Sequence, residues 1–168
     1  VSWSRGLGDV YKRQNLRITA FEVEHLPVYP SMGFRFDYKG RSIVISGDTD
    51  YSTNLIEQSK NADLLFHDAL SYNMIGRAED ISEIIQPQLS RVFYDIQGYH
   101  ASPVEAAQAA NEANVKELIF YHLIPAPDSF IAKIIFVKGV SEVRPDNWTL
   151  ADDCLLYTSD AADDRYRV

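Results

Sequence analysis

The chain has 168 residues, of which 46% are apolar and 24% charged, and its formal net charge is −8 at pH 7. This composition suits one globular domain with a buried core and excludes a disordered chain; no apolar run approaches the roughly 20 residues of a membrane span, and no basic segment leads into a signal-like apolar stretch. Cys154 is the single cysteine, so an internal disulfide is excluded, and a cytoplasmic location is favoured without being fixed.

The two ends of the chain differ in pattern from the middle. Residues 1–14 and 154–168 show no clear amphipathic period, and both resemble translated sequencing adapters at the ends of environmental gene fragments. We therefore predict one domain over residues 15–153 between two non-native tails. Removing the tail charges of +2 and −1 leaves the middle at −9. Because phosphate contacts need lysine and arginine, we expect from this acidic charge that the partner is not a large nucleic acid.

The first part of the domain is predicted to form strands, followed by a helix and a further strand. Residues 16–25 have a strand-like composition, and residues 34–46 predict a hairpin in which aromatic and polar residues alternate around a Lys-Gly turn. A short helix is expected at 53–60. A buried strand with a polar exit is expected at 62–69, which begins an alternation of helix and strand.

Residues 71–99 are less regular than their neighbours. A helix is expected near 80–85 and a second helical stretch at 89–94. Between them, Pro87 is expected to break the helical pattern, because proline lacks a backbone donor and clashes with the preceding turn.

The clearest local signal begins at Ser102. Ser102 and Glu105 have the spacing of a capping box, and Pro103 occupies the first helical position, so an alanine-rich helix is predicted to start here. Asn114 suits a left-handed residue after the helix, and residues 117–123 predict a buried strand. Helices that alternate with buried strands predict an α/β fold.

Asp48 follows a β-branched run in the stretch "ISGDTDYS", and two interpretations are open. In the first, Gly47 and Asp48 form a turn, and Asp50 or Ser52 caps the following helix. In the second, Asp48 is a metal ligand at the carboxyl end of a buried strand, where α/β folds place their sites.

The chain contains four histidines, and each lies near the end of a predicted strand or the start of a helix: His25, His67, His100 and His122. A single histidine in such a place is commonly structural, and for His67 we favour a role in bonding backbone carbonyls. Four histidines together with two aspartates indicate a metal site, because imidazole and carboxylate are the ligands of zinc or iron hydrolytic sites.

Four stretches together resemble the C-terminal half of a metallo-β-lactamase-fold hydrolase, closest to the ribonuclease Z and arylsulfatase branch. The stretches are "VEHLPVYPSMGFRFDYKGRSIVISGDT", "ADLLFHDA", "YHASPVEAAQAA" and "ELIFYHL". The resemblance covers about residues 16–150 and implies an αββα sandwich. The family's first metal motif, His-x-His-x-Asp-His, belongs upstream of residue 16, so the chain resembles a fragment whose N-terminal half is missing.

The resemblance also implies roles for single residues. His25, Asp48 and His122 correspond to metal ligands of a dinuclear site, with Asp48 bridging two divalent ions, zinc or else manganese or iron. His100 corresponds to a general acid, and Asp68 stands where the family usually has glutamate and orients the His100 ring.

The implied activity is hydrolysis of phosphodiester-like or related ester bonds in a small or short anionic substrate. In ribonuclease Z an arm that grips transfer RNA is inserted between the segments of His25 and Asp48, whereas residues 37–43 close this gap here. A metal-free pseudoenzyme or binding module, and redox chemistry at a di-iron centre, stay open as alternatives. The oligomeric state is not indicated.

The absent upstream half has consequences for the chain by itself. The apolar faces of residues 43–45, 64–66 and 118–120 would supply one half of an interface between two sheets. We expect them to form an exposed patch that promotes association. We also expect neither tight dinuclear metal binding nor hydrolase activity from residues 1–168 alone.

Overall fold

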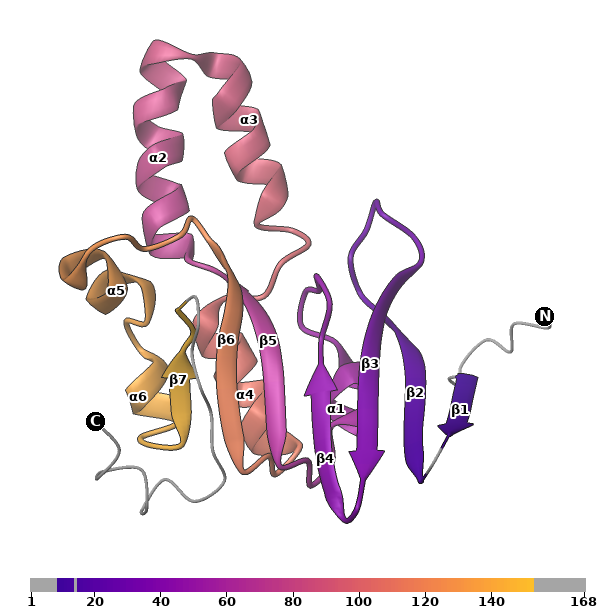
Figure 1. The fold of residues 1–168 in the computed structure, drawn as a ribbon. Helices are drawn as coiled ribbons and strands as arrows, with labels where there is room; N and C mark the ends of the chain where they lie inside the picture. Colours follow the sequence, from indigo (N-terminus) through magenta and orange to yellow (C-terminus); the bar gives the residue numbers. More distant parts are fainter. Residues whose placement is uncertain (1–8, 14, 153–168) are drawn as a thin grey trace.

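One mixed β-sheet organises the computed structural model, which describes residues 9–13 and 15–152 (Figure 1). The strands lie side by side in chain order; the first four are antiparallel to their neighbours, and β4 to β7 are parallel. Their bounds are β1 Asp9–Arg13, β2 Leu16–Val23, β3 Ser31–Tyr38, β4 Arg41–Ile45, β5 Leu64–Leu70, β6 Glu117–Ile124 and β7 Trp148–Leu150.

Helices connect the parallel strands, as an α/β fold requires. Their bounds are α1 Thr53–Gln58, α2 Tyr72–Ile85, α3 Pro87–Ile96, α4 Pro103–Glu112, α5 Phe130–Phe136 and α6 Val140–Val143. Helices α1 and α4 pack on the sheet, and α6 packs on α4 (Figure 1). None of the described helices is long and apolar enough to cross a membrane.

The predicted tails are only partly described. Residues 1–8 and 154–168 lie outside the described residues, so their assignment as tails stays a prediction. Residues Asp9–Arg13 pair with β2 as the edge strand β1. The structure therefore includes part of the first tail in the sheet, although no strand was predicted there.

The core lies between the sheet and α4. Val44, Leu65 and Leu118 are buried on adjacent parallel strands, and each contributes about 1.5–3 kcal/mol by its burial. The predicted alanine-rich helix is confirmed, with Ala106 and Ala110 fully buried. Small side chains on α4 let this helix lie close to the strands.

The other face of the sheet has large apolar side chains in contact with solvent. Ile43, next to the buried Val44, is 37% exposed because neighbouring strand residues point to opposite faces. Phe34 and Tyr38 of β3 are 39% and 46% exposed and lie on the same face. The expected apolar face is thus exposed at Ile43 of β4 and continues onto β3, where it was not predicted, whereas Ile119 of β6, which lies on the same face as Ile45, is buried. Whether it promotes association stays a prediction.

Local signals placed several elements correctly. Ser102 and Glu105 form the predicted capping box at the start of α4, and Ser52 caps α1 by accepting a hydrogen bond from the backbone of Leu55. Asn114 has a φ of 53°, as predicted for a left-handed residue after the helix. Each of these signals acts through neighbouring residues, so the sequence alone was sufficient.

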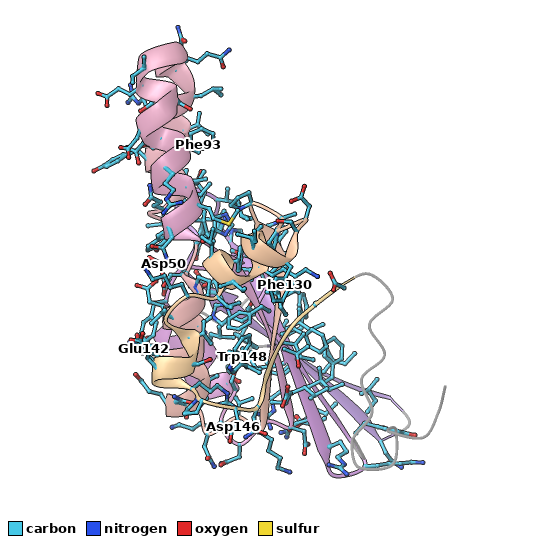
Figure 2. All side chains as sticks on the ribbon, turned by 90° about the vertical axis from the view of Figure 1, so that its left-hand side faces the viewer. Asp50, Phe93, Phe130, Glu142, Asp146 and Trp148 are labelled. Atoms are coloured by element: carbon cyan, nitrogen blue, oxygen red, sulfur yellow. The ribbon has the colours of Figure 1, made fainter. Side chains whose placement is uncertain are left out.

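The region 71–99 was predicted less well. It forms a long helical hairpin of α2 and α3 that projects beyond the sheet in both views (Figures 1 and 2). Helix α2 begins eight residues before the predicted stretch, with Ser71 as its N-cap. The Tyr72 hydroxyl in its first turn lies within hydrogen-bond distance of the carbonyl oxygens of Gln97 (3.1 Å) and His100 (2.9 Å). Pro87 separates the helices as expected and occupies the first turn of α3.

The carboxylate of Asp63 connects the segment before β5 with the start of β4 and with the segment before β6. It accepts hydrogen bonds from the Ser42 backbone at 2.7 Å and from Lys116 Nζ at 2.7 Å, with Arg41 at 3.3 Å. Chiefly through the hydrogen bond from Lys116, the pKa of Asp63 falls to about 2.

This pKa predicts an acid-dependent loss of stability. Because the folded pKa lies below the unfolded value of about 3.9, the carboxylate stabilises the fold fully above about pH 4, and this contribution is lost as pH falls through about 2. Unfolding measured against pH should show that Asp63→Asn loses less stability than the native chain between these values. Parallel curves for the two proteins would contradict the assignment.

Candidate active site

Polar side chains gather at the edge of the sheet where β4, β5 and β6 end. Asp48 follows β4, Asp68 lies in the last half of β5, and His122 lies in the last half of β6. His25 follows β2, and His100 precedes α4. Because carboxyl ends of parallel strands share one edge of a sheet, residues that are distant in the chain meet here.

The best-defined pair in this cluster is Asp68 with His100. Nδ1 of His100 donates to Oδ2 of Asp68 at 2.8 Å, and both residues are buried. The backbone of Thr49 also donates to this carboxylate, at 3.3 Å. Burial opposes ionisation of Asp68, but the hydrogen bonds from His100 and His67 outweigh it and lower the pKa of the carboxyl below its ordinary value. An ionised Asp68 fixes the imidazole and leaves Nε2 of His100 for other contacts.

His67 has a different environment. It lies inside β5 rather than at its end, and its ring is fully buried. Its Nδ1 donates to the backbone carbonyl of Asp68 at 2.8 Å and lies 3.2 Å from Oδ1 of the same residue. This contact agrees with the expected bond to a backbone carbonyl and adds a second imidazole beside the Asp68 carboxylate.

His122 reaches the cluster because β6 is irregular. The register between β5 and β6 shifts after Asp68, which pairs with Tyr121, whereas Ala69 pairs with Leu123. His122 is the extra residue, and its φ is 44°. Such a bulge redirects a side chain. Here it brings His122 Nδ1 to 3.2 Å from Oδ1 of Asp48, and both side chains are nearly half exposed.

The loop that carries Asp48 depends on a glycine. Gly47 has a φ of 69°, and a Cβ at this position would lie 2.4 Å from the carbonyl oxygen of Met32. Only glycine fits this combination of left-handed backbone and close approach. The turn interpretation of this segment is therefore correct for Gly47. The carboxylate of Asp48, however, faces His122.

His25 packs within the cluster but lacks polar partners. Its ring centroid lies 4.9 Å from that of His100 and 5.0 Å from that of Tyr99. Both ring nitrogens are shielded from solvent without a hydrogen-bond partner in the described part of the chain. Because shielded polar groups are almost always bonded, these nitrogens suit a residue that coordinates a metal ion.

The cluster fits a metal, but its closest grouping differs from the predicted ligand set. Ligand atoms of Asp68, His100 and His122 lie within 4.8 Å of one another. Of the predicted set, Asp48 and His122 are in contact, and His25 lies against His100. The fold thus brings all five predicted residues to one place. Their division into metal ligands and catalytic residues stays a prediction, with Asp68 and His100 as alternative ligands.

Sequence reasoning missed the supporting residues of the site. The Thr49 backbone and the Ser46 hydroxyl contact Asp68, with Ser46 accepting a hydrogen bond from the Asp68 backbone at 3.2 Å. The Tyr72 hydroxyl holds the carbonyl of His100. Each contact joins residues 19 or more positions apart, so no local pattern could have indicated them.

The family model and the related sequences that match this chain point to one family. A family model described as "Beta-lactamase superfamily domain" matches residues 7–123. The chain is similar to ribonuclease Z of Mycobacterium avium, with 35% identity over 119 residues that form 71% of this chain and 39% of that protein. Ribonuclease Z of Mycobacterium tuberculosis is 34% identical over a stretch that covers 71% of this chain and 40% of that protein. The chain thus spans about two fifths of these relatives.

Solved structures show the same fold. The metallo-beta-lactamase fold protein YhfI from Bacillus subtilis has a TM-score of 0.65 at 19% identity, covering 94% of this chain and 55% of that chain. Human tRNase Z, short form, has a TM-score of 0.50 at 25% identity, covering 67% of this chain and 38% of that one. The predicted resemblance and α/β fold are confirmed. The names of the ribonuclease relatives, however, are at odds with the prediction against a large nucleic acid substrate.

Proposed function

This chain belongs to the beta-lactamase superfamily, and from that premise we propose that it forms part of a metal-dependent hydrolase of phosphodiester or related ester bonds. The observation that carries the proposal is the pairing of His100 with Asp68 beside two further histidines at one edge of the sheet. The relatives named ribonuclease Z support a phosphodiester as the bond that is cleaved.

His25, Asp48 and His122 are the proposed metal ligands of this chain. Their nitrogen and oxygen atoms suit zinc, and manganese or iron would accept the same donors. Asp48 would bridge two ions. Metal ions bound there supply a water of lowered pKa as nucleophile and stabilise charge on the reacting oxygens.

His100 is the proposed general acid. Because its Nδ1 donates to the buried Asp68, its Nε2 is the atom that holds a proton for the leaving oxygen. Asp68 keeps the ring oriented, and the Tyr72 hydroxyl contacts the backbone carbonyl of His100. The chain therefore supplies a positioned proton donor beside its metal ligands.

Two substrate classes follow from this proposal. The acidic net charge of −8 favours a short anionic ester, because a long nucleic acid would meet repulsion outside the site. The ribonuclease names of the relatives favour RNA. Comparing the turnover of a short oligoribonucleotide with that of bis(p-nitrophenyl) phosphate distinguishes these classes.

The test begins with the native reading frame that precedes the predicted domain at residue 15. We expect it to encode His-x-His-x-Asp-His and the complete protein to contain zinc and hydrolyse one of the two substrates. Residues 1–168 alone should bind metal weakly and be inactive, because they offer each ion of a dinuclear site at most one histidine and the shared Asp48, whereas zinc sites use three or four protein ligands. A complete protein without this motif, metal or turnover would instead support a pseudoenzyme or binding module.

A further inference from the structure

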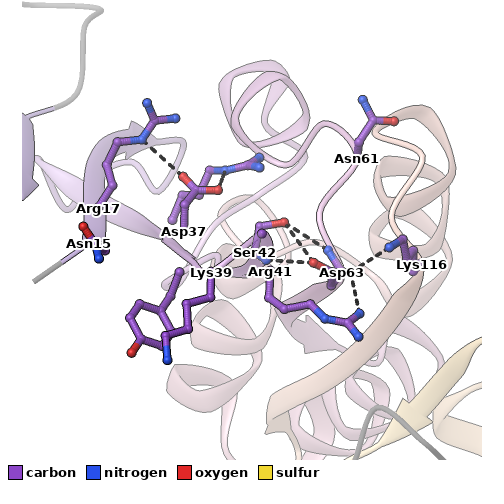
Figure 3. Close-up of a pocket in the computed structure, with 12 residues that line it drawn as sticks. Asn15, Arg17, Asp37, Lys39, Arg41, Ser42, Asn61, Asp63 and Lys116 are labelled. Carbon is purple, nitrogen blue, oxygen red and sulfur yellow. Dashed lines mark hydrogen bonds and ion pairs between the residues drawn. The ribbon is translucent and has the colours of Figure 1, made fainter.

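A polar pocket lies at the opposite end of the parallel strands from the histidine cluster. Its volume is about 440 Å³, and the turn between β3 and β4 and the segments before β5 and β6 line it. Figure 3 shows side chains from these separate segments directed toward one another. Since the histidines lie at the carboxyl ends of β5 and β6, this pocket is a separate site.

Positive charge is concentrated in the lining of this pocket. Five cations and two carboxylates give the lining a formal charge of +3, whereas the whole chain carries −8, so the remainder carries −11. The cations are Arg17, Arg35, Lys39, Arg41 and Lys116. A basic pocket on an acidic protein focuses an attractive field for anions at one place.

The two carboxylates cannot neutralise these cations, because each is shared. Asp63 contacts both Lys116, at 2.7 Å, and Arg41, at 3.3 Å (Figure 3). These two side chains are 69% and 63% exposed, so donors remain free to contact a ligand. The low pKa of Asp63 has the same origin in the surrounding positive charge.

Asp37 is shared in the same manner on the other side of the pocket. Arg17 lies 3.4 Å and Arg35 3.0 Å from its two carboxylate oxygens. Nη1 of Arg35 also donates to the carbonyl of Gln58 at 2.6 Å, which fixes the guanidinium in place. Each shared carboxylate therefore leaves one positive charge unbalanced. Lys39, whose Nζ lies 5.2 Å from the ring centre of Tyr38, supplies a third.

We propose that this pocket binds a small anion with two linked phosphate groups, such as inorganic diphosphate or the diphosphate of a nucleotide. Guanidinium groups match phosphate oxygens with pairs of parallel donors, and three unbalanced positive charges suit a multivalent anion. The pocket volume lies in the range of small-molecule sites.

The charge distribution favours a small anion over a nucleic acid. A long phosphate backbone would extend from the pocket over a surface whose remaining residues carry −11. Repulsion there opposes the release of counterions that drives nucleic acid binding. A diphosphate, in contrast, stays within the basic lining.

The test is a calorimetric titration of the complete protein with inorganic diphosphate, in chelator so that no metal contributes to binding. We expect saturable binding that weakens with added salt. Arg41→Gln and Lys116→Gln should each raise the Kd about tenfold, as expected for loss of one charge-assisted hydrogen bond. Lys39→Gln should weaken binding as well, and it leaves both carboxylate pairs intact if the other variants fail to fold.

Lys133→Gln is the matched control. Lys133 also pairs with a carboxylate, Asp152, at 2.7 Å, but it lies on α5 outside the pocket. Its loss should leave the Kd unchanged. Absence of saturable binding at millimolar diphosphate would overturn the proposal, as would equal weakening by Lys133→Gln. Tighter binding of an oligoribonucleotide than of diphosphate, weakened in turn by Arg41→Gln and Lys116→Gln, would assign the pocket to nucleic acid instead.

Discussion

Asp48→Ala is expected to remove both metal and activity from the complete protein. The proposed role of Asp48 is to bridge two ions, so its loss would disrupt both metal positions at once. His122, which lies 3.2 Å away, would also lose its partner in the described structure. A residue that only shaped the turn would cost about 0.5–2 kcal/mol of stability and leave the chemistry intact.

Elemental analysis of the purified variant, together with turnover of a phosphodiester, measures this outcome. Asp50→Ala is the matched control, because Asp50 is an aspartate of the same loop whose carboxylate accepts a hydrogen bond from the Tyr51 backbone at 2.7 Å. That variant should keep its metal. Full metal content and activity in Asp48→Ala would return this residue to the turn interpretation.

The second large effect is expected for His100→Ala. This variant should keep its metal, and its turnover should fall by a factor of about 10² to 10⁴. The loss should be greatest for substrates with poor leaving groups, because these depend on proton donation to the departing oxygen. Substrates with good leaving groups should be hydrolysed nearly as well as by the native protein.

This variant also separates the two assignments of the cluster. Because Asp68, His100 and His122 have ligand atoms within 4.8 Å of one another, His100 is also placed to coordinate an ion. Loss of metal from His100→Ala would make it a ligand and disprove its role as general acid. Tyr99→Phe is the control: its ring centroid lies 5.2 Å from that of His100, and the substitution keeps the ring.

The sequence by itself determined the features that depend on neighbouring residues. The capping box of Ser102 and Glu105 started α4 at the predicted position, and the apolar stretches at residues 62–69 and 117–123 identified the buried strands β5 and β6. The ordered motifs were sufficient for the family, which the later comparisons confirmed. The placement of Asp48, His25 and His100 next to element ends was also visible, since strand and helix limits follow local patterns, whereas His67 lies inside β5.

Only the tertiary structure decided which of these residues meet. Asp68 and His100 are 32 positions apart, and their hydrogen bond exists because β5 and the start of α4 reach the same edge of the sheet. The bulge that turns His122 toward Asp48 depends on the pairing of β6 with β5. The shared contacts of Asp63 likewise join separate strands, and the Tyr72 hydroxyl at the start of α2 contacts the carbonyl of Gln97, 25 positions away. Such contacts arise from packing between distant segments, which no local pattern of residues encodes.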